Sequence, residues 1–313
     1  MRIDYEKDLN PAQHEAATTL DGPVLVIAGA GSGKTRTIVY RLARLVESGV
    51  SPTEILLLTF TRKASSEMLH RAEALLGHQG LGHVRGGTFH GFAYSLLKQY
   101  AGLLGNECGF DMIYLDALDG EDILGQAKDR LQIGRGDRKF PKRATILGLY
   151  SKCRNKEMPL SQVLRQEAYH LGAYEDDLAR LIEEYERIKA ECGLLDYDDL
   201  LFLLERLLTE HPHVREAVTS SISHIMVDEY QDTNLVQARL VRLLTRPGDA
   251  RPNVMAVGDD AQSIYAFRGA NVKNILDFPK TFPGTRVVKL EQNYRSTQPI
   301  LELTNAILDG FRE

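Results

Sequence analysis

The chain has 313 residues, of which 43% are hydrophobic and 26% are charged, and this is the composition of a globular protein with room for two domains. A net charge of −5 argues against a general nucleic-acid binder, and three scattered cysteines argue against a disulfide framework or a structural metal. Since neither a signal peptide nor an apolar run of membrane-spanning length is present, we expect a soluble, cytoplasmic protein with no membrane partner.

Five short apolar runs predict buried parallel strands, because none of them alternates between apolar and polar residues. In chain order they occupy residues 23–28, 54–60, 224–229, 253–259 and 285–291. Helical patterns follow the first and third of these runs, with apolar residues recurring along one helical face. Such alternation of strands and helices predicts an α/β fold with a doubly wound parallel sheet.

Between residues 101 and 197 the strand patterns stop. Segments such as 175–193 instead place leucine, isoleucine and tyrosine side chains on one face of a helix. We therefore predict an all-helical subdomain at 101–197, inserted into an α/β domain that comprises residues 1–100 and 198–285.

The predicted insertion contains a strongly basic stretch. Residues 127–156 carry ten lysines and arginines but only two acidic residues, although the whole chain is acidic. This uneven distribution favours contact with a polyanion, and the alternative is a solvated helical surface.

A glycine-rich loop lies directly between the first predicted strand and the helix that follows it. In "AGAGSGKT" the glycines let backbone N–H groups turn toward an anion, and the helix N-terminus adds the positive end of its dipole. Lys34 is expected to reach the β- and γ-phosphates of a nucleotide, and the Thr35 hydroxyl to bind Mg²⁺. The predicted phosphate loop comprises Ala28, Gly29, Ala30, Gly31, Ser32, Gly33, Lys34 and Thr35, with Ala28 where the usual pattern has glycine.

Adjacent carboxylates follow the third predicted strand in "IMVDEYQDTN" (225–234). Ligands of open α/β sheets bind at the carboxyl ends of the strands, where Asp228 suits a magnesium shell and Glu229 suits activation of a water. Two carboxylates at this position also occur as a helix cap. Together with the phosphate loop, they predict a magnesium-dependent nucleoside triphosphatase.

Seven segments in a fixed order resemble the N-terminal motifs of the UvrD/Rep/PcrA branch of superfamily 1 DNA helicases. They are "LNPAQHEA", "AGAGSGKT", "LLLTFTRKASSEM", "GTFHGFA", "VDEYQDTN", "GDDAQSIYAFRGA" and "LEQNYRST", and they extend from Leu9 to about Thr297. "LLDYDDLL" at the end of the predicted insertion is also typical of that branch. The resemblance implies a RecA-like P-loop NTPase domain that couples Mg·ATP hydrolysis to 3′–5′ movement on single-stranded DNA.

The resemblance also implies roles around ATP. Gln13 would recognise the adenine edge, and Tyr294 would stack near the base. Arg295 would lie near the γ-phosphate, and Arg36, just after the phosphate loop, would be another nucleotide contact. Gln262 would sense the γ-phosphate or the attacking water.

On the DNA side, the resemblance implies four aromatic residues that stack on unpaired bases without reading sequence, although a single aromatic is also commonly a core residue. They are Phe60, Phe89, Tyr265 and Phe267, the last where the family usually has tryptophan. Other side chains would hold sugar or phosphate and so fix register. These are Arg62, Thr88, His90 and Arg268, together with Arg138, Lys139, Lys142 and Arg143 of the basic stretch.

The motor of this family needs two RecA-like halves, and the motifs of the second are not found after "NYRST". We expect residues 286–313 to begin that second motor domain or to be a connecting segment. The 313-residue chain is therefore expected to bind Mg·ATP, single-stranded DNA and DNA junctions, but to hydrolyse ATP poorly and to need the missing C-terminal motor domain for unwinding.

Other functions remain open at this stage. A subunit of a helicase–nuclease would share the same motifs. A P-loop nucleotide phosphotransferase would share the phosphate loop but would be indifferent to DNA, and a regulatory ATP-binding module would keep the fold without the catalysis.

Overall fold

A six-stranded parallel sheet forms the centre of the protein in the computed structural model, which describes residues 3–77, 81–104, 113–262 and 269–310. The strand order is β3-β2-β6-β7-β1-β8, and every neighbouring pair is parallel. The strands are β1 (Val24–Ala28), β2 (Ile55–Thr59), β3 (Arg85–Thr88), β6 (His224–Val227), β7 (Val254–Gly258) and β8 (Arg286–Leu290). The α/β class is thereby confirmed.

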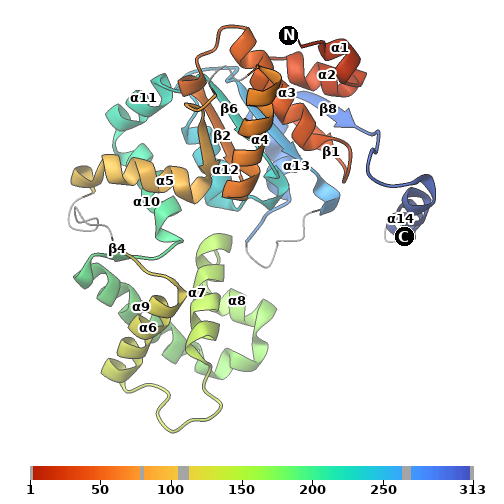
Figure 1. The fold of residues 1–313 in the computed structure, drawn as a ribbon. Coiled ribbons are helices and arrows are strands. Elements are labelled where there is room, and N and C mark those ends of the chain that lie inside the picture. The colour runs from red at the N-terminus through yellow and green to blue at the C-terminus, as the bar shows by residue number, and fades with distance from the viewer. Residues whose placement is uncertain (1–2, 78–80, 105–112, 263–268, 311–313) are drawn as a thin grey trace.

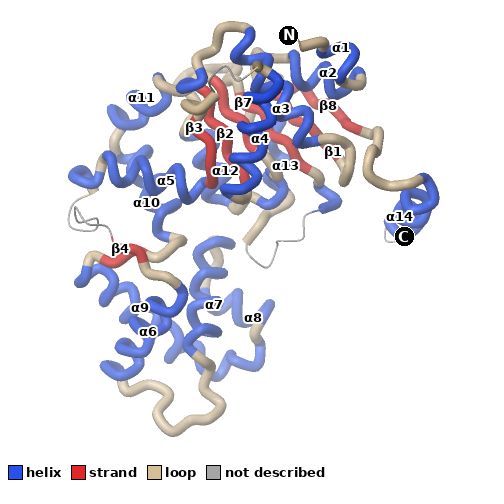
Figure 2. Tube along the Cα trace, viewed as in Figure 1, coloured by secondary structure: helices blue, strands red, loops and turns tan. Residues whose placement is uncertain are grey.

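Helices pack on both faces of this sheet (Figure 1, Figure 2). Along β2, Ile55 and Leu57 face one apolar core while Leu56 and Leu58 face the other, and all are buried because successive side chains point to opposite faces. The helices of the α/β part are α1 (Tyr5–Asp8), α2 (Pro11–Thr18), α3 (Lys34–Glu47), α4 (Arg62–Leu75), α5 (Phe89–Gln99), α10 (Asp199–Glu210), α11 (Pro212–Ser220), α12 (Leu235–Leu243) and α13 (Lys273–Thr281).

A second, helical body lies below the sheet domain in Figure 1 and has an apolar core of its own. Leu124, Leu178 and Leu181 are fully buried in that core. Its helices are α6 (Ala117–Leu131), α7 (Arg143–Lys156), α8 (Leu160–Glu167) and α9 (Glu175–Cys192). Because each of these helices has an apolar face, the body buries apolar surface independently of the sheet.

The expectation that the insertion is entirely helical is wrong in one detail. Two short strands, β4 (Ile113–Tyr114) and β5 (Leu194–Leu195), pair in parallel where the chain enters and leaves the helical body. Two-residue strands carry too little periodicity to be recognised from sequence.

Each of the five predicted strands is present, with its bounds shifted by one or two residues, but β3 was not predicted. Its sequence "RGGT" has two glycines, which are uncommon in strands. The predicted domain boundary after residue 285 also falls too early, because β8 pairs with β1 along its whole length.

Beyond β8, helix α14 (Gln298–Gly310) projects away from the sheet (Figure 1). Its apolar residues Ile300, Leu303 and Ile307 are exposed. Among the described helices, none combines the length and the apolar character that crossing a membrane requires.

Candidate nucleotide and nucleic-acid sites

The glycine-rich loop connects β1 to α3 as predicted from its sequence. Ala28 is fully buried as the last residue of β1, which explains how a methyl group is tolerated there. Gly31 and Gly33 have φ angles of 75° and 89°, and this left-handed conformation favours glycine. Helix α3 begins at Lys34, so the loop ends at a helix N-terminus, where backbone N–H groups suit an anion.

Gln13 braces this loop from the side. Its Nε2 donates to the carbonyl of Ser32 at 3.0 Å, and its Oε1 accepts the backbone N–H of Asn10 at 3.2 Å. The side chain is only 1% exposed, and a Cβ on Gly33 would lie 2.4 Å from its Nε2. The structure therefore places Gln13 as a support of the phosphate loop, with both ends of its amide used within the protein.

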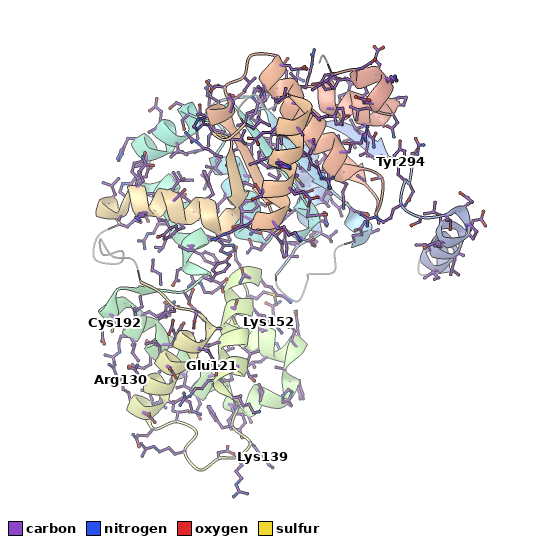
Figure 3. All side chains as sticks on the ribbon, in the orientation of Figure 1. Glu121, Arg130, Lys139, Lys152, Cys192 and Tyr294 are labelled. Atoms are coloured by element: carbon purple, nitrogen blue, oxygen red, sulfur yellow. The ribbon has the colours of Figure 1, made fainter. Side chains whose placement is uncertain are left out.

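The segment after β8 lies against the other side of the loop. Asn293 donates to the carbonyl of Ala30 at 2.6 Å, and the backbone N–H of Tyr294 donates to the carbonyl of Gly31 at 2.8 Å. The Tyr294 ring is 57% exposed beside the sheet domain (Figure 3). Sequence positions 263 residues apart are thus joined at one loop, and Asn293 is a contact that the sequence did not reveal.

Arg36 is directed away from the loop in this structure. Its guanidinium donates to the carbonyl of Asp8 at 2.7 Å and lies over the ring of Tyr40, 5.1 Å from the centroid. Arg36 thus has partners in α1 and α3, and its nucleotide contact stays a prediction.

The two predicted carboxylates follow β6, directly beside the phosphate loop. Lys34 Nζ lies 2.9 Å from Glu229 Oε2 and forms an ion pair with it. Glu229 itself has a φ of 49°, so the chain turns sharply after the strand. Asp228 is 8% exposed, and its Oδ1 has no hydrogen-bond partner among the described residues.

Burial raises the pKa of Asp228 to about 7, and the neighbouring Glu229 carboxylate adds to this effect while Lys34 opposes it. A buried carboxylate oxygen without a partner fits a divalent cation, and the Thr35 hydroxyl lines the same cavity. This donor set of carboxylate and hydroxyl oxygens suits Mg²⁺.

A cavity of about 570 Å³ brings most of the predicted catalytic residues together. Thr35, Asp228 and Glu229 line it, as do Gln262 and Arg295 from the later segments. The Gln262 amide donates to the carboxylate of Asp259, which follows β7. The parallel strand order explains this convergence, since the carboxyl ends of β6, β7 and β1 lie side by side.

Two polar residues at this site were quoted in the sequence motif but given no role. Gln231 is 1% exposed and contacts Glu229, Asp232 and the backbone of Asp259. Burial raises the pKa of Asp232 to about 6, and the charge of Glu229 raises it further while Lys34 lowers it. The sequence feature that could have identified both residues is the spacing in "DEYQD", which places them in the turn after β6.

A second cavity, of about 530 Å³, lies between the sheet domain and the helical body. Phe60, Thr88 and His90 line it from the carboxyl ends of β2 and β3, and Lys152 lines it from α7 (Figure 3). Phe60 is 44% exposed, as a stacking platform requires, and it also lines the 570 Å³ cavity.

His90 stacks on Tyr197, with ring centroids 3.8 Å apart and planes inclined by 19°. Burial lowers the pKa of His90 to about 4, so its imidazole is neutral at physiological pH and offers hydrogen bonds without a charge. The Thr88 hydroxyl accepts the N–H of Gly91 at 3.1 Å and thereby caps α5.

Phe89 is a core residue in this structure. It is 6% exposed and belongs to an apolar core cluster, and it also lines the 530 Å³ cavity, so base stacking by its ring stays a prediction. Arg62 lines a neighbouring cavity of about 890 Å³ beside β3, and it does not line the cavity that contains Phe60. Tyr265, Phe267 and Arg268 lie outside the described residues.

The four basic residues predicted to contact DNA backbone are exposed at the far end of the helical body, as Lys139 shows in Figure 3. We name them the insertion tip: Arg138, Lys139, Lys142 and Arg143. Other basic residues of the same stretch are neutralised by distant acids, since Lys152 and Lys156 pair with Glu167 and Arg154 pairs with Asp199. The positive surface is therefore smaller than residues 127–156 suggested.

One group of three carboxylates has the spacing of a metal site, within the residues that the structure describes. It comprises Glu186, Asp196 and Asp199. The ammonium of Lys189 lies among them, at 3.2, 2.6 and 2.9 Å respectively, and supplies the positive charge. We read this cluster as a buried ion-pair network at the base of the helical body.

Comparison with known proteins identifies the family of this chain. Residues 9–283 match the family described as the UvrD/REP helicase N-terminal domain. "ATP-dependent DNA helicase PcrA" of Bacillus subtilis (strain 168) is 38% identical over 302 residues, covering 96% of this chain and 39% of the relative. The protein of the same name from Staphylococcus aureus (strain NCTC 8325 / PS 47) is 37% identical over 307 residues, covering 97% of this chain and 40% of the relative. The chain thus spans about two fifths of these curated relatives.

Proposed function

Because this chain belongs to the family of the UvrD/REP helicase N-terminal domain, we propose that it is the ATP-binding half of an ATP-dependent DNA helicase and translocase. Its relatives carry the name of such a helicase over a longer chain. The substrate would be single-stranded DNA and its junctions with duplex, and movement would run 3′–5′, as the sequence motifs imply. A cytoplasmic location and a second motor domain as partner belong to the same proposal.

The observation that carries the proposal is the meeting of Lys34, Asp228 and Glu229 at the end of the phosphate loop. Lys34 would neutralise the β- and γ-phosphates, and Glu229 would orient and deprotonate the attacking water. Asp228 and Thr35 would hold Mg²⁺, which would draw charge from the phosphate oxygens when bound. Gln262 and Arg295 border the same cavity and would act on the γ-phosphate.

The arrangement of the two cavities supports coupling to DNA. Phe60, Asp228, Glu229 and Asp232 line both of them, so the proposed catalytic carboxylates separate a nucleotide side from a nucleic-acid side. A base stacked on Phe60 would therefore lie next to the residues that act on ATP. A small-molecule phosphotransferase has no use for such a shared wall.

Equilibrium binding tests the proposal on the 313-residue chain. A fluorescent ATP analogue with Mg²⁺ is titrated with and without oligo(dT), using the wild-type chain, Lys34→Ala and Glu229→Gln. We expect the wild-type chain to bind the ATP analogue and Lys34→Ala to bind it with an affinity at least about tenfold lower. We also expect the nucleotide affinity of the wild-type chain to change when DNA is added. Nucleotide binding that ignores DNA would contradict the motor assignment and favour a phosphotransferase.

We also propose that residues 1–313 alone are a poor ATPase, because an arginine supplied from the far side of the nucleotide contributes about 10³–10⁵ in rate in comparable sites. Steady-state phosphate release with saturating oligo(dT) measures this directly. Vigorous DNA-stimulated turnover that Glu229→Gln abolishes would show that the chain needs no second half for chemistry.

A further inference from the structure

Gln231 lines the 570 Å³ cavity and contacts Glu229 and Asp232, which line both cavities. It is held in η5 (Tyr230–Asp232), the short helical turn after the Glu229 bend, and it is almost completely buried. Its Nε2 donates to Glu229 Oε2 at 2.9 Å and to Asp232 Oδ2 at 3.3 Å. Its Oε1 accepts the backbone N–H of Asp259 at 3.0 Å.

This set of partners requires an amide. Two carboxylates need a donor, and a backbone N–H needs an acceptor, and only asparagine and glutamine offer both on one short, uncharged side chain. The neighbouring backbone is shaped to admit it, since a Cβ on Gly258 would lie 2.5 Å from Gln231 Oε1. Gly258 ends β7, so the amide is clamped between the ends of two neighbouring strands.

The contacts continue outward in three directions. Toward the nucleotide side, Glu229 pairs with Lys34 of the phosphate loop. Toward the loop after β7, Asp259 receives the Gln262 amide. Toward the nucleic-acid side, Asp232 lines the 530 Å³ cavity, and its Oδ1 is buried without a partner among the described residues.

We infer that Gln231 is a positioning residue that couples the nucleic-acid cavity to the Glu229 carboxylate. A ligand that displaces Asp232 moves an acceptor of the Gln231 amide, and one that displaces Asp259 moves its donor. In either case the amide shifts and reorients Glu229, to which it also donates. Gln231 and Gln262 both line the nucleotide cavity, but the printed side-chain contacts of Gln231 are with Glu229, Asp232 and the backbone of Asp259, whereas Gln262 donates to the Asp259 carboxylate. The inference rests on the proposed function, because it assumes that the two cavities bind ATP and single-stranded DNA.

The test is a coupling measurement on the 313-residue chain. The affinity of a non-hydrolysable ATP analogue with Mg²⁺ is measured with and without saturating oligo(dT), and the ratio of the two dissociation constants is the coupling factor. Any change that a variant makes to the basal affinity cancels in this ratio. We expect a wild-type factor of about fivefold or more, which falls toward one in Gln231→Met, a side chain of similar length without the amide.

Asn253 supplies the matched control. The side-chain amide of Asn253 is partly buried and also links neighbouring segments, since it accepts the N–H of Gly22 at 2.8 Å and donates to the carbonyl of Ser223 at 3.4 Å. It lies at the opposite end of β7, away from both cavities. We expect Asn253→Leu to lower the melting temperature and to keep the wild-type coupling factor.

A second variant, Gln231→Glu, keeps the shape of the side chain and replaces the donor by an acceptor, so it covers the case in which Gln231→Met does not fold. The pH dependence gives an independent readout, because the Gln231 hydrogen bond lowers the pKa of Asp232. Losing that bond should raise the pKa of Asp232. Any remaining coupling that requires the ionised Asp232 carboxylate should then appear only at higher pH.

The outcomes separate the two claims. If the wild-type chain shows coupling and Gln231→Met retains it within about twofold, the inference is wrong while the proposed function stands. If Gln231→Met cannot bind nucleotide at all, Gln231 belongs to the binding site and is not a coupling residue. If the wild-type chain does not bind nucleotide, or binds it without regard to DNA, the proposed function fails first.

Discussion

The buried carboxylate of Asp228 should make the folded chain less stable as the pH rises, and Asp228→Asn should remove this effect. In the folded chain its pKa is about 7, compared with an ordinary value of 3.8. Folding therefore opposes ionisation: the unfolded chain loses this proton near pH 4, and the folded chain keeps it until about pH 7. The wild-type stability contribution of Asp228 is greatest below its unfolded pKa and declines until the pH has passed its folded pKa.

The magnitude follows from the two pKa values. Each pH unit over which only the unfolded chain is ionised costs about 1.4 kcal/mol, so the loss between about pH 5 and pH 8 is about 2–3 kcal/mol. Asparagine carries no charge, so Asp228→Asn should gain that amount relative to wild type over the same range. Other titrating groups are common to both proteins and cancel in the difference.

Urea unfolding at about pH 5 and pH 8 measures this difference directly. The expected result is a gap between Asp228→Asn and wild type that widens by about 2–3 kcal/mol at the higher pH. Adding Mg·ATP at pH 8 should stabilise wild type far more than the variant, because the metal needs the ionised carboxylate. A gap that is the same at both pH values would refute the reasoning, because it would mean that Asp228 ionises as readily in the folded chain as in the unfolded chain.

Three further predictions concern the loop and the DNA surfaces. Gly33→Ala should destabilise the chain by about 1–3 kcal/mol in thermal or urea unfolding, because alanine is strained at a φ of 89° and its Cβ would overlap the Gln13 amide. Phe60→Ala should weaken oligo(dT) binding by about 1–3 kcal/mol in fluorescence anisotropy, and an unchanged affinity would exclude base stacking there. Charge reversal of the insertion tip should weaken DNA binding. It should also reduce the slope of log K against log salt concentration by about 0.7 for each phosphate contact that is lost, and an unchanged slope would show that the tip does not contact DNA.

Local sequence predicted those parts of the site that depend on one strand and the loop after it. The phosphate loop between β1 and α3 and the carboxylates after β6 were found because their spacing fixes their geometry. The strand order of the sheet then places Lys34 Nζ 2.9 Å from Glu229 Oε2. The order of the motifs in the sequence predicts that these residues meet, but it gives no distance.

The misses share a different cause, which is that tertiary packing decided the outcome. Phe89 has the residue type and position of a stacking platform, and the fold places it in the apolar core and also on the lining of the 530 Å³ cavity. The basic stretch loses much of its charge to Glu167 and Asp199, which are distant in sequence. Gln231 received no role from the sequence, because its contacts with Glu229, Asp232 and the backbone of Asp259 depend on the folded chain.

The short β4–β5 pairing has a consequence for how such a chain can change over evolution. It fastens the outgoing and returning segments of the helical body side by side at one attachment to the sheet domain, and the end of α7 also contacts the α12 region through Asn155–Asn234 and Glu157–Arg239. Helices beyond that attachment can lengthen, shorten or exchange surface charge without altering the register of any strand that carries a proposed catalytic residue. The ion pairs of Asp199 with Lys189 and Arg154 preserve the orientation at the attachment. The outer helices of the helical body and the strands of the sheet domain can therefore vary separately.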